Sequence, residues 1–461
     1  MSMGIASSEL IGPLFVRPQF ASIFSDRHRL QALLDVEAAL ARAEAECGVI
    51  PPQAAETIAG KCRADLFDIA ELGAATARAG NPVIPLVRAL TALCGEDAGR
   101  YVHWGATTQD IMDSALVLQL RIVLRLAEGE LDELIAALAA LAARHRDTPM
   151  AGRTFMQQAL PVTFGFRAAG WLSPLLRARA RLDEMAPRLF AVQFGGAVGT
   201  LASLGADGLK VQAALAGQLD LAIPDMPWHA ARDRFAELAA NCALVAGALS
   251  KIARDITLLS QTEIAEVSEP AEKGRGGSST MPQKRNPVGA IAVLAACEHV
   301  EALLPVMTRS MAADHERGTG TWHGEWLALP DIVVHAASAL ATMRELAGGL
   351  VVDTRRMRAN LDLTGGLVMA EAAMMALAPG LGRLAAHDLV GRACAAASTQ
   401  GKHLKDILGA DQAVREALGA GSLEQLFDPA TYTGQAGAFV DRVLAEAARQ
   451  QGERDSKGSR I

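Results

Sequence analysis

One segment of the sequence combines residue types that can move a proton and stabilise a negative charge. Residues 273–287 read KGRGGSSTMPQKRNP, with two adjacent serines, Ser278 and Ser279, between basic side chains. The glycines before the serines permit backbone conformations that other residues avoid, so backbone N–H groups can turn toward a bound anion. A solvated surface loop would explain the glycines and charges, but not Met281 and Pro282 beside the serines. The segment therefore indicates a catalytic loop.

This loop is not a phosphate-binding P-loop, because no Gly-Lys-Ser or Gly-Lys-Thr follows a glycine at the required spacing. Four further segments place polar side chains between apolar stretches. They are YVHWGATTQD at 101–110, GRTFMQ at 152–157, GAVGT at 196–200 and HERGTGTWHGEW at 315–326. In the last of these, Trp322 and Trp326 have helical spacing, so core packing is an alternative explanation for both.

The composition of the whole chain argues against several classes of protein. The 461 residues carry a net charge of -7, so general binding to nucleic acid or to an anionic membrane is not expected. We see no secretory signal at the N-terminus and expect no membrane span. The six cysteines are scattered, without CxxC pairs or metal-ligand spacing to histidine. We expect reduced thiols in a cytoplasmic protein, with no metal and no cofactor.

Long helical segments dominate the middle of the chain. Apolar residues recur at helical spacing, among strong helix formers, in the segments 114–146, 161–189, 229–266, 288–312 and 330–350. Several are apolar around most of their circumference and must be buried on several sides. We therefore predict an all-α fold, a long central helical bundle (113–350) with smaller N-terminal (1–112) and C-terminal (351–461) helical domains. We see no alternating pattern that would indicate a strand.

The serine loop is similar to the GSSxMPxKxNP signature of the fumarase/aspartase superfamily, and the chain is identified as a member of it. The segment 101–110 resembles the HxGxTSxD segment of that superfamily, and 152–157 resembles its GRTHxQ segment. The turn at 196–200 matches its GAVGT turn, so the resemblance extends over nearly the whole chain. It implies a cofactor-free enzyme that is a homotetramer, with the three polar segments meeting at each site from different subunits.

One position departs from the superfamily pattern. The second segment normally carries a histidine after the threonine, and here Phe155 stands there. A phenylalanine cannot transfer a proton. One branch has the same feature, the bacterial 3-carboxy-cis,cis-muconate cycloisomerases, whose HERxxxxWHxEW segment residues 315–326 resemble. That resemblance implies closure of a muconate tricarboxylate to 4-carboxymuconolactone in protocatechuate (β-ketoadipate pathway) degradation. The attacking carboxylate is already ionised at neutral pH and needs no general base.

The resemblance also implies roles for individual residues. Ser278 would exchange the carbon-bound proton, with Ser279 as the open alternative, while Lys284 and Asn286 would stabilise the carbanion. His103 would contact substrate or act as a proton partner. The residues expected to bind the substrate are Thr107, Thr108, Arg153, Thr154, Gln157, Ser279, Met281 and Arg317. A structural role is equally open for Arg153.

Two other functions remain open at the level of sequence. The first is a different lyase of the superfamily, such as adenylosuccinate lyase, although Phe155 argues against a reaction that benefits from a proton donor at the leaving group. The second is a non-catalytic helical scaffold, as found among relatives of argininosuccinate lyase. The intact serine loop with Lys284 and Asn286 argues against the scaffold.

Overall fold

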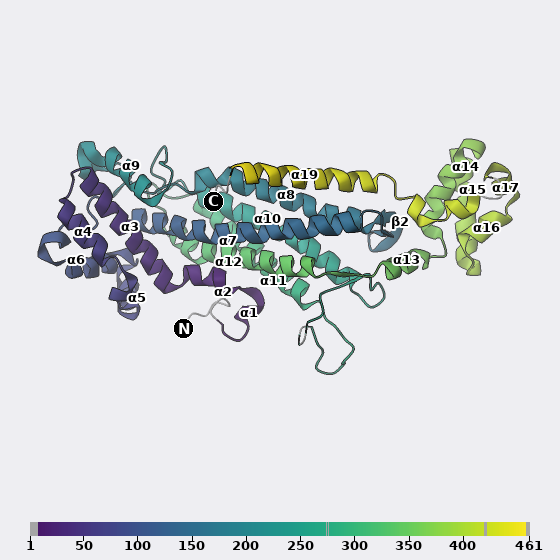
Figure 1. Cartoon of the computed structure of the whole chain (residues 1–461), viewed down its shortest axis with the longest axis horizontal. Coiled ribbons are helices and arrows are strands. Elements are labelled where there is room, and N and C mark those ends of the chain that lie inside the picture. The colour runs from purple at the N-terminus through teal and green to yellow at the C-terminus, as the bar shows by residue number, and fades with distance from the viewer. Residues whose placement is uncertain (1–7, 273, 275, 419–421, 458–461) are drawn as a thin grey trace.

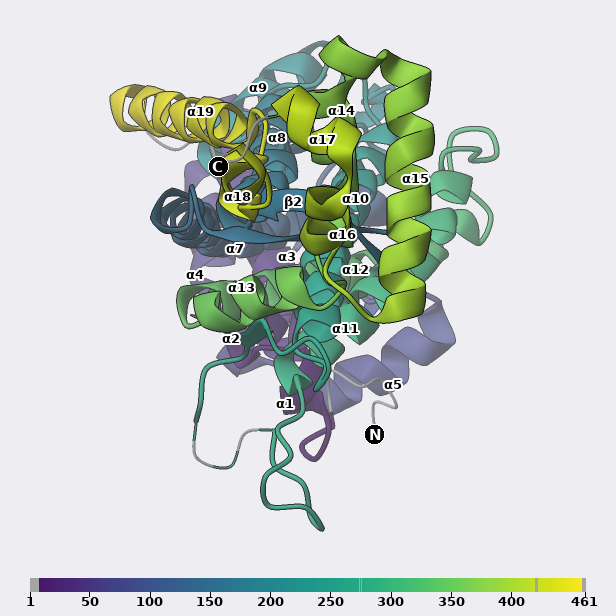
Figure 2. The same cartoon turned by 90° about the vertical axis from the view of Figure 1, so that its right-hand side faces the viewer.

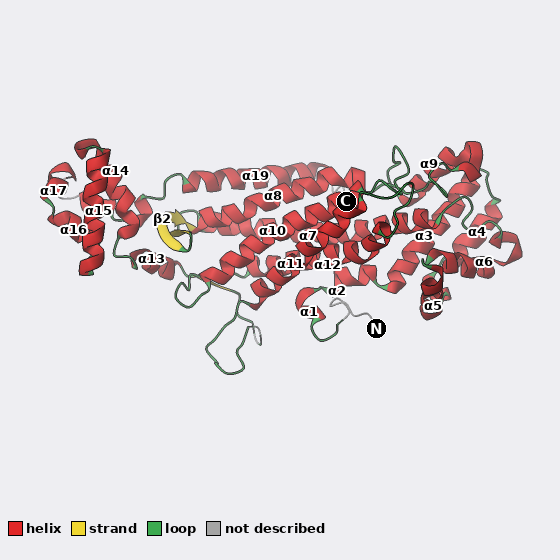
Figure 3. Cartoon of the chain, turned by 180° about the vertical axis from the view of Figure 1, so that it is seen from behind, coloured by secondary structure: helices red, strands yellow, loops and turns green. Residues whose placement is uncertain are grey.

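The computed structural model describes residues 8–272, 274, 276–418 and 422–457. The molecule is long and built almost entirely of helices (Figures 1 and 3), as the sequence predicts. The helices are α1 (Gly12–Phe15), α2 (Pro18–Ala21), α3 (Asp26–Glu46), α4 (Pro52–Lys61), α5 (Ile69–Ala79), α6 (Val83–Gly99), α7 (Thr108–Arg144), α8 (Phe164–Leu189), α9 (Gly208–Leu219), α10 (Asp233–Leu259), α11 (Val288–Ser310), α12 (Thr321–Gly348), α13 (Thr354–Asp362), α14 (Ala370–Leu381), α15 (Arg383–Gln400), α16 (Leu404–Ala410), α17 (Gln412–Leu418), α18 (Ser422–Leu426) and α19 (Ala436–Lys457). The strands are β1 (Pro149–Thr154), β2 (Gln157–Thr163), β3 (Val267–Ser268) and β4 (Val351–Val352).

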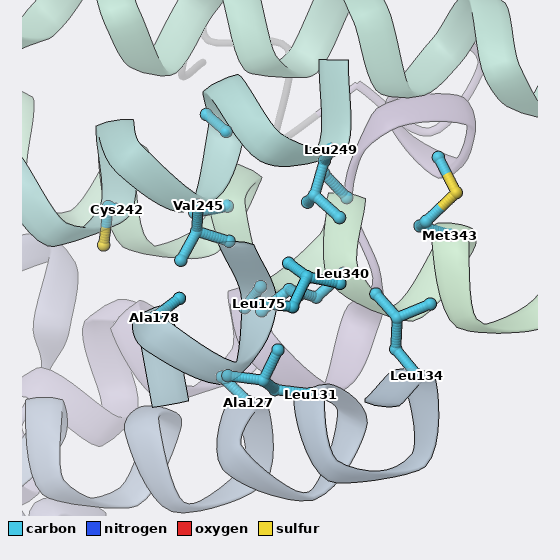
Figure 4. Close-up of a cluster of buried hydrophobic side chains, with 14 of the residues drawn as sticks. Ala127, Leu131, Leu134, Leu175, Ala178, Cys242, Val245, Leu249, Leu340 and Met343 are labelled. Carbon is cyan, nitrogen blue, oxygen red and sulfur yellow. The ribbon is translucent and has the colours of Figure 1, made fainter. Parts of the chain in front are cut away.

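The central bundle consists of α7, α8, α10, α11 and α12, which run along the long axis of the molecule (Figure 1). Figure 4 shows part of its core, in which side chains from four of these helices meet, among them Leu131 of α7, Leu175 of α8, Leu249 of α10 and Leu340 of α12. Each of these four helices is covered on more than one side, which explains why their sequences are apolar around most of the circumference. With 37 residues, α7 spans about 55 Å and sets the length of the bundle.

At one end of the bundle, α3 to α6 and α9 pack around a core of their own. The longest of them, α3, starts directly after Ser25. Ser25 precedes the helix in an extended conformation, and its hydroxyl accepts a hydrogen bond from the backbone N–H of His28. Such a cap satisfies a donor that the first turn of a helix leaves unpaired.

At the other end, α14 to α18 form a small separate core, seen end-on in Figure 2. The chain then turns back, and α19 lies along α8 and α7 of the bundle (Figure 1). Residues 351–461 therefore occupy two places, the small end cluster and the side of the bundle. Likewise α7 begins at Thr108, before the predicted boundary at residue 113. The division into three domains remains a prediction.

The expectation that the chain has no strand is wrong at residues 149–163. Here β1 and β2 pair antiparallel, with Thr154 opposite Gln157, and the two residues between them are Phe155 and Met156. Both have positive φ, 50° and 66°, as a two-residue type I′ hairpin turn requires. That turn normally signals itself by Asn-Gly or a similar pair, and Phe-Met gives no such signal.

Two helices are more apolar than the sequence reading allowed. By length and composition alone, α11 and α12 could each cross a membrane. In α12, 78% of the most apolar stretch is buried inside the protein, so its apolarity serves the core. In α11 only 39% is buried, so much of this helix presents apolar surface away from its own chain.

Candidate active site

The serine loop stands away from the body of the molecule (Figure 2). The two ends of the loop meet at its base, where the backbone N–H of Asn286 donates to the carbonyl of Gly276 at 2.8 Å. Gly276 has φ 68°, and a Cβ at this position would lie 2.5 Å from the Asn286 carbonyl oxygen. Glycine is therefore required here both by the backbone conformation and by the close approach.

The Ser278 hydroxyl is folded into the loop. Its oxygen accepts hydrogen bonds from the backbone N–H groups of Met281 at 3.1 Å and Thr280 at 3.3 Å. Ser278 is half-buried, whereas Ser279 and Lys284 are exposed. Two N–H groups aimed at one oxygen stabilise negative charge on it. This geometry supports Ser278 over Ser279 as the proton-transfer residue, a role that stays a prediction.

Glu269 precedes the loop in the sequence, and its carboxylate caps the start of α11, the helix that follows the loop. Its two oxygens accept from the backbone N–H groups of Gly289 at 3.1 Å and Ala290 at 2.7 Å. A carboxylate at this point pairs donors that the helix cannot use itself and interacts favourably with the helix dipole. The cap fixes the point at which the loop rejoins the bundle.

The segment 101–110 lies at the start of α7 and is held by a buried aspartate. Asp110 accepts from the backbone N–H groups of Gly195 and Gly196, both at 2.9 Å, and lies 2.7 Å from Nε2 of His229. Thr107 and Asp110 also form a reciprocal capping box at the helix N-terminus. The Gly-rich turn and the first helical turn of α7 thus form one rigid unit.

Arg317 joins this unit from a distant part of the sequence. Its guanidinium donates to the Gln109 side-chain oxygen at 3.1 Å, the Ala197 carbonyl at 3.1 Å and the Thr107 hydroxyl at 3.4 Å. All three acceptors are neutral oxygens, so they orient the guanidinium without cancelling its charge. The predicted segments 101–110 and 315–326 therefore meet within one chain, and Arg317 is suited to pair with a carboxylate.

A buried ion network lies next to this unit. It was not predicted from the sequence. Arg232 donates to Asp113 at 2.6 Å and to Glu325 at 2.5 Å, and all three side chains are at most 2% exposed. Burial alone would lower the pKa of Arg232, but the two carboxylates outweigh it and raise the pKa. The Trp322 indole N–H donates to Asp113 at 3.2 Å. Trp322 is thus a packing and hydrogen-bonding residue, the alternative weighed for it above.

His103 lies in the turn before α7, in a left-handed backbone conformation with φ 61°. Its Nδ1 is 2.6 Å from Oε1 of Glu37, a residue of α3 that is 1% exposed. Burial lowers the pKa of His103, but the charge and hydrogen bond of Glu37, with a contribution from Asp110, outweigh this and raise the pKa overall. Glu37 had no signal in the sequence, because it is one of several charged residues along α3 and no local motif marks it.

The third predicted segment forms the tip of the β1–β2 hairpin. Thr154 and Gln157 are exposed there, Phe155 is 97% exposed and Met156 is 66% exposed. An apolar ring so open to solvent, held in a strained backbone conformation, is unusual for a monomeric protein. The hairpin tip is therefore an exposed apolar surface.

Arg153 lies next to the hairpin tip, opposite Gln158, and its side chain pairs with a buried carboxylate. Its guanidinium pairs with both carboxylate oxygens of Glu266, at 2.9 and 2.7 Å, and Glu266 is fully buried. Breaking this pair would leave an uncompensated buried charge. The geometry therefore favours the structural role that was left open for Arg153 over the expected binding of a substrate carboxylate.

The predicted site residues thus fall into two groups at opposite ends of the bundle. His103, Thr107, Thr108 and Arg317 lie at the start of α7. The hairpin follows the far end of α7, about 55 Å away along the helix. The Arg153–Glu266 pair places the segment that leads into the serine loop beside the hairpin. One chain alone does not bring the two groups together (Figure 1).

Among the residues that the structure describes, no group of three or more His, Cys, Asp or Glu side chains is placed to hold a metal ion. The described site consists instead of hydroxyls, amides, backbone N–H groups and fixed cations. Such groups are suited to binding an anionic substrate and stabilising developing negative charge.

Comparison with known proteins agrees with this geometry. The family model described as "Lyase" matches residues 15–301, and the one described as "Adenylosuccinate lyase C-terminus" matches residues 366–443. The chain belongs to this lyase family, the fumarase/aspartase superfamily recognised in its motifs.

Relatives within the family are similar over nearly their whole length. A 3-carboxy-cis,cis-muconate cycloisomerase from Pseudomonas aeruginosa is 51% identical, covering 96% of this chain and 97% of the relative. The crystal structure of the 3-carboxy-cis,cis-muconate lactonizing enzyme from Pseudomonas putida superposes with a TM-score of 0.93 at 48% identity, covering 96% of this chain and all of that one. A nitrosuccinate lyase from Streptomyces davaonensis is 42% identical, covering 95% of each chain.

Proposed function

We propose that this chain is a 3-carboxy-cis,cis-muconate cycloisomerase that closes its substrate to 4-carboxymuconolactone in the degradation of protocatechuate. The observation that carries the proposal is the full-length similarity to cycloisomerases from two Pseudomonas species. The exposed Phe155 at the hairpin tip, where the superfamily pattern has a histidine, supports it independently.

The chemistry follows from the charges. A carboxylate of the substrate attacks a double bond of the same molecule, forming a carbon–oxygen bond and leaving a carbanion next to another carboxylate. The nucleophile is already ionised, so the absence of a histidine at position 155 costs nothing. Ser278 delivers a proton to the carbanion and is recharged from solvent, while Lys284 and Asn286 stabilise the charge. The trianion becomes a dianion, so each turnover takes up one proton.

A substrate panel tests this proposal. Purified protein without added metal or nucleotide is mixed with 3-carboxy-cis,cis-muconate, adenylosuccinate, argininosuccinate or fumarate. We expect ultraviolet absorbance to fall with the muconate only, because lactone formation shortens the conjugated system. In weak buffer, one proton should be consumed per molecule converted. Cleavage of adenylosuccinate without turnover of the muconate would instead favour the lyase suggested by the match at 366–443.

We further propose a cytoplasmic homotetramer with shared active sites. Three observations support association of this kind: the separation of the two residue groups along α7, the exposed hairpin tip, and the low burial of α11, in which only 39% of the most apolar stretch is buried. Closed symmetric assemblies of identical chains are the usual way to cover such surface.

Mixing inactive variants tests the shared site. One parent carries His103→Gln and the other Ser278→Ala, and each alone is expected to retain only a small residual activity. The two are gently dissociated, combined and reassembled, and each parent is treated alone as the control. Activity should return only in the mixture, because some sites then receive intact segments from both. Demonstrated mixed oligomers without activity, or a monomer at micromolar concentration, would contradict the proposal.

A further inference from the structure

Glu37 is a buried carboxylate that contacts His103, a predicted site residue in the turn before α7. It lies on α3, an element outside every segment that resembles the family motifs. Its Oε1 is 2.6 Å from His103 Nδ1, and its Oε2 has no hydrogen-bond partner in the described part of the chain. Among the described residues, His103 is the only hydrogen-bond partner of Glu37.

Two further titratable groups near the Glu37–His103 pair are neutral and do not change its charge. Glu44, two helical turns further along α3, is fully buried, and burial together with the charge of Glu37 raises its pKa to about 9. It is therefore protonated at neutral pH and contributes no charge. Burial and Glu37 also raise the pKa of the Cys62 thiol, which stays neutral. Among the described residues, His103 is the side chain that hydrogen-bonds the Glu37 carboxylate, and in its protonated form it balances a charge that would be costly to bury alone.

The turn and the bond to Glu37 together restrain the imidazole of His103. His103 occupies the left-handed region, which costs a non-glycine residue about 1–2 kcal/mol. The following Gly105 is also left-handed, with φ 76°, and a Cβ there would lie 2.8 Å from the Leu204 side chain. The backbone of the turn is therefore restricted at both His103 and Gly105. With Nδ1 bound to Glu37, the ring presents Nε2, which forms no hydrogen bond with any described residue.

We propose that Glu37 is a positioning residue that holds His103 as an imidazolium with its Nε2–H directed at a carboxylate of the substrate. This inference rests on the proposed function and adds to it a residue and a role. His103 then acts as a fixed cation that binds an anion, and not as a general base. Asp110, the other carboxylate that acts on His103, is occupied by Gly195, Gly196 and His229 and sustains the same charge state.

The first test measures His103 directly, without turnover. The imidazole is titrated by NMR in the isotope-labelled assembled protein, with the His103→Gln variant used to assign its signal. In the unaltered protein we expect titration above the ordinary histidine value of about 6.5. In Glu37→Gln the midpoint should fall by at least about one unit, because the balancing charge is removed. Glu44→Gln is the matched control and should leave it unchanged, since Glu44 is already neutral. An ordinary midpoint in the unaltered protein would overturn the proposal.

The second test uses turnover. Glu37→Gln should raise KM for the muconate at least about tenfold with a smaller change in kcat, because an anion contact is weakened before the chemical step. The alkaline limb of kcat/KM should move to lower pH. The sign follows because activity needs protonated His103 and is lost as pH rises through its pKa, which the substitution lowers. Glu44→Gln should leave both the rate and the pH profile in place.

A double variant separates positioning from mere support of the fold. If Glu37 acts through His103, then Glu37→Gln combined with His103→Gln should be no slower than His103→Gln alone. Losses that multiply would overturn the proposal. If the unaltered protein turns over no muconate at all, the proposed function fails, while the NMR titration still decides whether the Glu37–His103 pair exists as described.

Discussion

The start of α7 and the serine loop both carry groups for the proposed chemistry, but their surroundings differ. At the start of α7, Asp110, Asp113 and Arg232 are at most 2% exposed and each is paired with charged or amide partners. In the loop, Lys284 is exposed, and the hydrogen bonds of Ser278 to described residues all go to other groups of the loop. The core fixes the groups at the start of α7 in place, whereas few contacts with the core hold the serine loop.

This contrast separates stability from activity. A change in the loop should remove chemistry without loosening the fold, since few other groups depend on it. A change in the ion network should weaken the fold, since buried charges lose their partners. The following substitutions test that division.

The largest effect on turnover is expected from Ser278→Ala. Removing the hydroxyl that delivers the proton should lower kcat by roughly a thousandfold. Helical content by circular dichroism and the unfolding midpoint should stay as in the unaltered protein. Ser279→Ala is the matched control and should lose much less. If Ser279→Ala is the inactive one, the proton-transfer role moves by one residue.

The largest effect on stability is expected from Arg232→Met. It leaves Asp113 and Glu325 buried without their cation, and we expect a loss of about 3–5 kcal/mol in the free energy of unfolding. Denaturant titration measures it. Arg188→Met is the control, because Arg188 is exposed and its pair with Glu237 should contribute little. Equal losses in the two variants would mean that burial does not distinguish them.

A smaller effect on turnover is expected from Gly276→Ala. An alanine must adopt φ 68° at a cost of about 1–2 kcal/mol and must move the Asn286 carbonyl away. The loop base then shifts, and we expect kcat/KM to fall by about ten- to a hundredfold. Gly277→Ala, where the added methyl meets open space and φ is not positive, should cost less. The reverse order would show that the loop base does not position the serine.

The smallest effect is expected from Phe155→His. The nucleophile is already ionised, so a new proton acceptor should change lactone formation by less than about threefold. Initial rates from ultraviolet absorbance measure this. A large gain in rate would contradict the ionised-nucleophile argument, and it would also weaken the use of Phe155 to distinguish this chain from other lyases.

Much of the fold could be predicted because apolar residues at helical spacing mark the long helices in the sequence. The segment 288–312 corresponds to α11 almost residue for residue. In contrast, α12 begins at Thr321, whereas the sequence predicts a helix only from residue 330, and Pro330 lies within the helix. A proline removes a helical hydrogen bond and clashes with the preceding turn, so it ends a helix unless tertiary packing offsets that cost.

The site was predicted less evenly. Motifs such as the serine loop are contiguous and can be recognised by their spacing. Glu37, Arg232 and Asp113 lie far apart in the sequence and belong together only after folding, so no local pattern marks them. The hairpin was missed for a related reason, because its turn residues, Phe155 and Met156, do not favour the conformation that they adopt.

The length of α7 has a consequence for how this protein works at different concentrations. Because α7 is a packed helix and not a hinge, no bending within one chain can close its span of about 55 Å. If sites form only between chains, catalysis obeys mass action for the protein itself. Activity per mole should then fall on dilution below the dissociation constant of the assembly and recover with a lag on reconcentration.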